Sequence, residues 1–344
     1  MEIQSQSLSG WKRFILDWLG PLVVFSLLIN TVFWGSHLPG FLSATNFMNI
    51  FRQAAVAVAL AMGTALVCVP NGCIDLSMPG MIALATAILG LRLQNTGKSG
   101  ILIALLVCCL IGAFNGFLIA YLKVPSVLIT LPMMFLLFFI ARTITGGQIL
   151  ARFERPPVFF GLDGGAAALI HLLLCAGIAV GLHFLTGHLT SRSKIFGILP
   201  FVGSAAIAAL AAYYLLARNS AAIPTVGSSY WRMLIFFWGA LSTSRLLGRT
   251  SLVFAAALIP AYYHAILINV LSIVGMASNV QLNIVLAQMV LFVVLAFIYH
   301  FLRRRWAGPQ PRLLDYGIKS IPYLDAFLRS AAEKHRQEPP NRRG

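Results

Sequence analysis

The chain has 344 residues, of which 59% are hydrophobic and only 10% are charged, and its mean hydropathy is +0.86. Soluble proteins carry about 25% charged residues, so this composition excludes a soluble domain and predicts an integral membrane protein of the helical type. The formal net charge is +16, but Lys and Arg lie at the ends of apolar runs and in the C-terminal tail. That distribution is typical of topology signals and of contact with membrane lipid, and it does not indicate a nucleic-acid partner.

Apolar runs divide the chain into about ten segments that are long enough to cross a bilayer, since one span needs about 20 residues. The predicted spans lie at about 18–36, 50–70, 77–92, 99–121, 126–142, 165–187, 196–217 and 231–247, and the uncharged run 250–302 has room for two more. We expect residues 1–17 to be a cytoplasmic N-terminal segment, 18–302 the transmembrane domain and 303–344 a basic cytoplasmic tail. The sequence therefore predicts an all-α, polytopic membrane protein with both termini in the cytoplasm.

The five cysteines lie in or beside these apolar segments, and no pair has the spacing of zinc ligands. We interpret them as packing residues. The seven histidines are scattered and show no metal-binding or paired-acid pattern. We therefore expect no metal site, no cofactor and no catalytic residues in this chain.

One stretch, from Pro70 to Gly80, interrupts the apolar sequence with two prolines, two glycines and the carboxylate of Asp75. Asp75 is the only acidic residue between Asp17 and Glu154. Irregular backbone at membrane depth persists only where protein or a water-filled cavity satisfies its polar groups, and an intramembrane carboxylate indicates a functional site. The alternative is a short loop at the membrane surface, in which Asp75 is a solvated cap of the following helix.

Four motifs in order over about 100 residues resemble the permease subunit of ribose-type sugar ABC importers, which is related to the branched-chain amino-acid permeases. They are Asn71-Gly72-Cys73-Ile74-Asp75-Leu76-Ser77, the Asn-Gly helix end from Gly112 to Ala120, the segment Lys123 to Leu131, and Thr145-Gly146-Gly147. The resemblance implies a transmembrane permease domain with two pseudo-symmetric halves and the translocation path between them.

The resemblance also implies a function and a set of partners. Such a subunit imports a sugar or a similar small polar solute across the bacterial inner membrane and is not itself an enzyme. Its partners would be an ABC ATPase, an extracytoplasmic solute-binding protein and a second permease subunit, identical or different. The chain contains no Gly-x-x-x-x-Gly-Lys-(Ser/Thr) motif, so ATP hydrolysis would belong to the partner.

The candidates for the translocation path are polar residues of these motifs: Asn71, Asp75, Ser77, Asn115 and Thr130. Two of them have simpler interpretations. Asn115, which lies between Gly112 and Gly116 on a face of small residues, could form an interhelical hydrogen bond without touching solute. The hydroxyl of Thr130 could bind the backbone of its own helix.

The second half of the chain departs from the family pattern. Members carry an acidic cytoplasmic stretch in the region that contacts the ATPase, whereas this chain has no acidic residue from Gly164 to Leu314. That acidic stretch is missing here, and extra apolar sequence around 165–217 partly makes up for the lost length. The remaining candidates for ATPase docking are the basic residues Arg192, Lys194, Arg245 and Arg249. The alternative function is a permease-derived, non-transporting scaffold or accessory subunit of another membrane complex.

Overall fold

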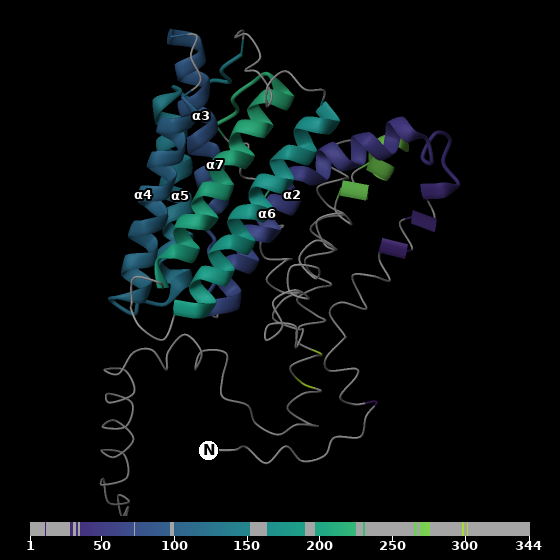
Figure 1. Ribbon diagram of the computed structural model, residues 1–344. Coiled ribbons are helices and arrows are strands. Elements are labelled where there is room, and N and C mark those ends of the chain that lie inside the picture. The colour runs from purple at the N-terminus through teal and green to yellow at the C-terminus, as the bar shows by residue number, and fades with distance from the viewer. Residues whose placement is uncertain are drawn as a thin grey trace, which may run out of the picture.

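The computed structural model describes residues 35–71, 73–96, 100–151, 164–189, 197–224 and 269–275, together with a few isolated positions (Figure 1). For residues 69–71, 96 and 184–189 only the backbone is described. In this part of the chain every long element is an α-helix. The helices are α2 (Ala44–Asn71), α3 (Met78–Thr96), α4 (Ile101–Ala120), α5 (Ser126–Ile144), α6 (Gly164–Leu189) and α7 (Leu199–Asn219).

Six of the predicted spans coincide with these helices within a few residues. The largest differences are that α2 begins at Ala44, before the predicted start at about 50, and that α3 continues past Arg92 to Thr96. The prediction of an all-α, polytopic membrane protein is confirmed for the described part of the chain. The predicted span 231–247 and the predicted tail 303–344 lie outside the described residues, and so does most of the predicted span 18–36, of the run 250–302 and of the N-terminal segment.

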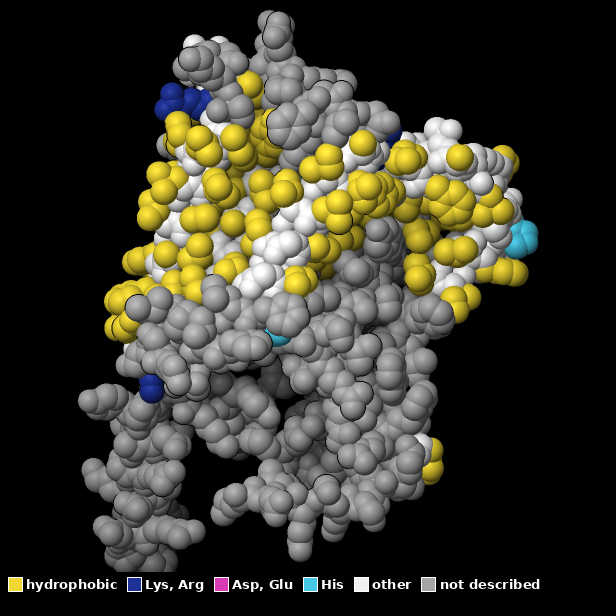
Figure 2. All heavy atoms as spheres, in the orientation of Figure 1, with side chains coloured by type: hydrophobic (Ala, Val, Ile, Leu, Met, Phe, Trp, Pro, Cys, Tyr) yellow, Lys and Arg dark blue, Asp and Glu magenta, His cyan; other side chains and the backbone are white. Residues whose placement is uncertain are grey.

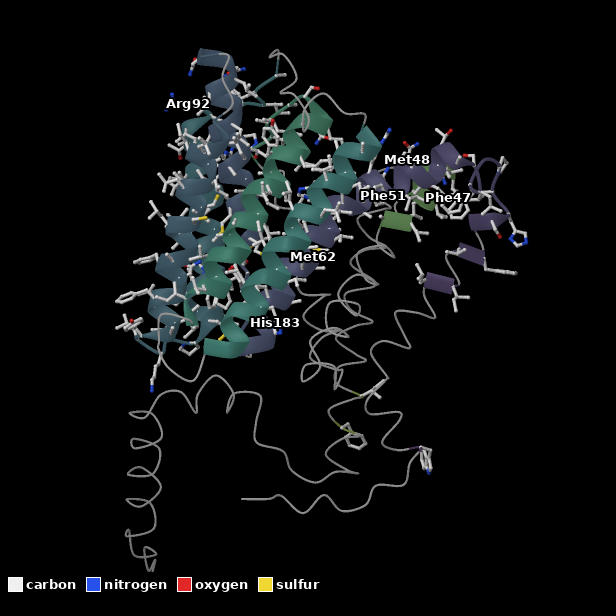
Figure 3. All side chains as sticks on the ribbon, in the orientation of Figure 1. Phe47, Met48, Phe51, Met62, Arg92 and His183 are labelled. Atoms are coloured by element: carbon white, nitrogen blue, oxygen red, sulfur yellow. The ribbon has the colours of Figure 1, made fainter. Side chains whose placement is uncertain are left out.

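Five of the described helices are long and apolar enough to cross a membrane: α2, α4, α5, α6 and α7. Helix α3 is not among them, because Arg92, Gln94 and Asn95 make its last turns polar. In Figure 3, Arg92 lies at the end of α3 that forms one end of the helix bundle. The total of about ten spans stays a prediction.

Helices α2, α3 and α7 form the interior of this bundle. Helix α7 packs against α2, α3, α4 and α6, and α3 also packs against α5. Small residues allow this arrangement, since seven of the 21 residues of α7 are alanines and most of its length is buried. The interior position of α7 therefore follows from the small size of its residues and not from their hydrophobicity alone.

Helices α4 and α5 lie outside this interior and divide their residues between two faces. Their buried faces carry small or medium residues, which are Ala104, Cys108, Gly112, Asn115, Gly116, Thr130, Met134, Leu137 and Ala141. Their outer faces carry large apolar side chains such as Leu102, Leu106, Phe135 and Phe139. Figure 2 shows hydrophobic side chains along the length of the described helices, with Lys and Arg at their margins. An outer surface of this kind is suited to lipid rather than to water.

Candidate functional site

The interrupted stretch is a true break between two helices. Helix α2 ends at Asn71, α3 begins at Met78, and residues 73–77 between them are not helical. Asp75 and Ser77 are both fully buried. Asp75 is therefore not a solvated cap, and the surface-loop alternative is wrong. The break lies among packed helices, which is the condition under which irregular backbone is tolerated in a membrane domain.

Three hydrogen bonds hold the Asp75 carboxylate. Its Oδ1 accepts the Ser77 backbone N–H at 3.0 Å and the Ser77 hydroxyl at 2.5 Å. Its Oδ2 accepts the hydroxyl of Ser204, from the second turn of α7, at 2.8 Å. Hydrogen bonds to a charged acceptor are the stronger kind, so this set offsets part of the cost of removing the carboxylate from water.

No basic side chain among the described residues pairs with Asp75. Arg92, the basic residue of α3, lies 14 positions beyond Met78, the first residue of that helix, which is about 20 Å along the helix axis. In the described part of the chain Asp75 is also the only carboxylate. In the described part of the chain the site is thus a buried acid surrounded by hydroxyl and amide groups, without an ion-pair partner.

Asn115 joins α4 to this group. Its Nδ2 donates to the Ser77 hydroxyl oxygen at 3.0 Å, while its Oδ1 is buried without a hydrogen-bond partner. The neighbouring glycines permit the close approach: a Cβ on Gly112 would lie 2.5 Å from the Phe201 carbonyl oxygen, and one on Gly116 would lie 3.0 Å from the Ile198 Cα. The predicted small-residue face is confirmed, and so is the interhelical hydrogen bond of Asn115.

Thr130 is fully buried but lies at the edge of this group. Its hydroxyl donates to the Ser126 carbonyl of its own helix at 2.9 Å and reaches the Ile74 carbonyl at 3.5 Å. The Ser126 hydroxyl accepts the Ile74 backbone N–H at 3.2 Å. Helix α5 therefore supports the backbone next to Asp75 without touching the carboxylate, and the own-helix interpretation of Thr130 is confirmed.

Ser204 is the functional candidate that sequence reasoning missed. The segment 165–217 looked like added apolar length, yet it supplies α7 and the third donor to Asp75. The available signal was a single hydroxyl beside Gly203 in an alanine-rich run. A Cβ on Gly203 would collide with Leu182 and lie 2.7 Å from Leu66 Cδ2, so this part of α7 is in close contact with its neighbours. We call Asp75, Ser77, Asn115 and Ser204 the polar cluster.

Several predicted residues lie outside the described part of the chain. They are the side chain of Asn71 and the docking candidates Arg192, Lys194, Arg245 and Arg249. Among the described residues no group of three or more His, Cys, Asp or Glu is placed to hold a metal ion.

Comparison with known proteins gives relatives over most of the chain. Residues 46–187 match the family described as "Branched-chain amino acid transport system / permease component". The ribose import permease protein of Escherichia coli is 27% identical over 317 residues, which cover 85% of this chain and 98% of that protein. No solved structure matches the chain.

Two further relatives match shorter stretches. The galactose/methyl galactoside import permease protein of Salmonella typhimurium is 32% identical over 144 residues, 37% of this chain and 42% of that protein. An inner membrane ABC transporter permease protein of Escherichia coli is 29% identical over 174 residues, 47% of this chain and 51% of that protein. The ribose permease alignment covers 85% of the chain and therefore continues beyond residue 187, into the half whose motifs are weak.

Proposed function

We propose that this chain, which is similar to the permease subunits of sugar-type ABC importers, is the membrane-spanning subunit through which a sugar or similar small polar solute crosses the bacterial inner membrane. The relatives are transport subunits, and the chain carries no nucleotide-binding motif of its own. The energy would come from a separate ABC ATPase.

The observation that carries this proposal is the buried carboxylate of Asp75 at a helix break inside a bundle of membrane-length helices. An ionisable residue is costly in such a place and is retained where a pathway or a site needs it. Asp75 belongs to the motif Ile74-Asp75-Leu76-Ser77 by which the chain resembles its relatives. Its hydrogen-bond acceptors and hydroxyl neighbours suit a neutral, hydroxyl-bearing solute.

The translocation path would be lined by Asp75, Ser77 and Asn115, with Thr130 and Asn71 beside them. In the described conformation the first four side chains are fully buried. A solute therefore reaches them only when helices around the cluster separate, as alternating access requires. This conformation corresponds to a path closed at the cluster.

Three partners complete the proposed transporter: the ABC ATPase, an extracytoplasmic solute-binding protein and a second permease subunit. For the ATPase we propose contact with the basic loops that hold Arg192, Lys194, Arg245 and Arg249. Reversal of charge at these positions, for example Arg192→Glu with Lys194→Glu, is expected to weaken ATPase binding. Reversal of the charge of Lys123, which lies in the connection between α4 and α5, provides the control.

One observation favours a second function, a scaffold derived from a permease. The absence of acidic residues from Gly164 to Leu314 removes a feature of the family's ATPase-contacting region. An alignment that covers 98% of the ribose permease favours the transport function instead, because nearly the whole length of that permease has a counterpart in this chain.

Co-purification tests the proposed function against this alternative. The full chain is isolated from its native membranes in mild detergent, and the proteins that remain bound to it are identified. A stable complex that holds the ATPase in fixed proportion supports transport. Isolation with an unrelated membrane complex and without any ATPase contradicts it and favours the scaffold.

A further inference from the structure

We propose that Ser204 is a positioning residue that keeps the polar cluster closed, and that solute gains access to Asp75 when the Ser204–Asp75 hydrogen bond opens. The proposal rests on the proposed function, because it assigns the closing contact of that same path. It gives α7 a specific role that the motifs of the first half do not reveal.

The first argument is the origin of the donors to Asp75. Two of the three come from Ser77, which belongs to the same short non-helical segment as Asp75. The third comes from Ser204, 129 positions along the chain, on a different helix. Among the described residues, Ser204 is thus the donor to the Asp75 carboxylate that comes from a different helix rather than from residues 73–77.

The second argument is the close packing of α7 against α4 and α2 next to Ser204. On α4, a Cβ at Gly112 would lie 2.7 Å from the Ala205 Cβ, and on α7 a Cβ at Gly203 would lie 2.7 Å from Leu66 Cδ2 of α2. Close packing of this kind leaves the serine little freedom to turn or slide. The hydroxyl is therefore held at Asp75 by the packing of α7 on two neighbouring helices.

The third argument is the unsatisfied acceptor beside this contact. Asn115 is fully buried, its Nδ2 binds Ser77, and its Oδ1 has no partner. A buried acceptor without a donor is unfavourable, and a water molecule or a solute hydroxyl would remove that cost. Separation of α7 from residues 73–77 would admit such a donor next to Asn115 and Asp75.

The native residue Cys73 provides a reporter for this opening. It lies two positions before Asp75 in the same non-helical segment and is half-buried. In a chain where Cys73 is the sole cysteine, its rate of reaction with a maleimide measures how often the segment opens. The other four cysteines, all replaced by Ala, are Cys68, Cys108, Cys109 and Cys175.

The test compares this reporter chain with and without Ser204→Ala, in membranes, without ATPase or solute. Loss of one interhelical hydrogen bond is expected to raise the labelling rate about fivefold. Thr86→Val is the matched control. Thr86 is as deeply buried, but its hydroxyl binds carbonyls of its own helix, Ile82 and Ala83, both at 2.9 Å. This control is expected to leave the rate unchanged.

An unchanged rate in Ser204→Ala, or an equal rise in Thr86→Val, would overturn the proposal. If Ser204→Ala does not accumulate, Asp75→Asn weakens the same bond from the acceptor side and is expected to raise the rate in the same direction. An unchanged rate in Asp75→Asn then overturns the proposal as well. Since labelling needs neither ATPase nor solute, its result is independent of whether the chain transports.

Discussion

Helices α5 and α7 are of similar length and each carries one fully buried hydroxyl near the helix break, but they use it differently. The hydroxyl of Thr130 in α5 donates its short hydrogen bond, 2.9 Å, to the carbonyl of Ser126, four residues earlier in the same helix. Ser204 of α7 donates across the bundle to Asp75 at 2.8 Å. The residue that the family motifs point to is peripheral, and the one that they do not point to holds the carboxylate.

The two helices also differ in how they are buried. In the most apolar window of α7, 72% of the residues are buried, against 22% in α5, whose outer face carries Leu128, Phe135 and Phe139. Ser204 thus lies on a helix that is surrounded by partners, and Thr130 on one whose outer face is exposed. Burial of the helix does not decide the partner alone, because Thr86 of the interior helix α3 bonds its own helix and Asn115 of the more exposed α4 bonds Ser77. The following substitutions test this comparison, from the largest expected effect to the smallest.

Asp75→Ala is expected to have the largest effect. It leaves the hydroxyls of Ser77 and Ser204 buried without their acceptor, and since each such group costs about 1–3 kcal/mol, we expect the free energy of unfolding to fall by about 2–4 kcal/mol. Thermal unfolding of the purified chain in detergent measures this. Asp75→Asn, which keeps an acceptor oxygen of similar size, should lose clearly less; equal losses would mean that the hydrogen-bond network is not what stabilises the break.

Gly112→Ala tests whether close packing of α4 positions α7. The new Cβ would lie 2.5 Å from the Phe201 carbonyl oxygen, so the two helices must separate, at a cost of about 1–3 kcal/mol in unfolding free energy. Gly177→Ala in α6 is the matched control, because a Cβ there meets nothing within 4 Å. We expect it to be neutral or stabilising. A neutral result for Gly112→Ala would show that α7 tolerates displacement.

Ser204→Ala removes a single donor and is expected to cost about 1 kcal/mol of unfolding free energy, the range of interhelical hydrogen bonds in membranes. In a double-mutant cycle with Asp75→Asn, the two losses should not add, since both weaken one contact. Strict additivity would indicate that the serine acts on something other than Asp75.

Thr130→Val is expected to have the smallest effect, below about 0.5 kcal/mol, because its short hydrogen bond is to its own helix and valine has a similar shape. The same thermal unfolding assay applies. A loss as large as that of Ser204→Ala would erase the distinction between α5 and α7.

The sequence predicted much of this architecture for physical reasons. Apolar runs and their polar ends located six helices within a few residues, and the Pro70–Gly80 stretch located the break. Asn115 was predictable as a contact residue because Gly112 and Gly116 flank it. Ser204 was not, because its role depends on which helices pack together, and that long-range arrangement leaves only a weak local signal in an alanine-rich segment.

Solute uptake by proteoliposomes that contain the chain together with the proposed ABC ATPase and solute-binding protein tests the central claim most directly. Wild type and Asp75→Ala are compared at equal amounts of assembled complex, with Thr130→Val as the buried control. We expect Thr130→Val to keep ATP-driven uptake and Asp75→Ala to lose it while still binding the ATPase. Uptake by Asp75→Ala at the wild-type rate would contradict the assignment of the polar cluster to the translocation path.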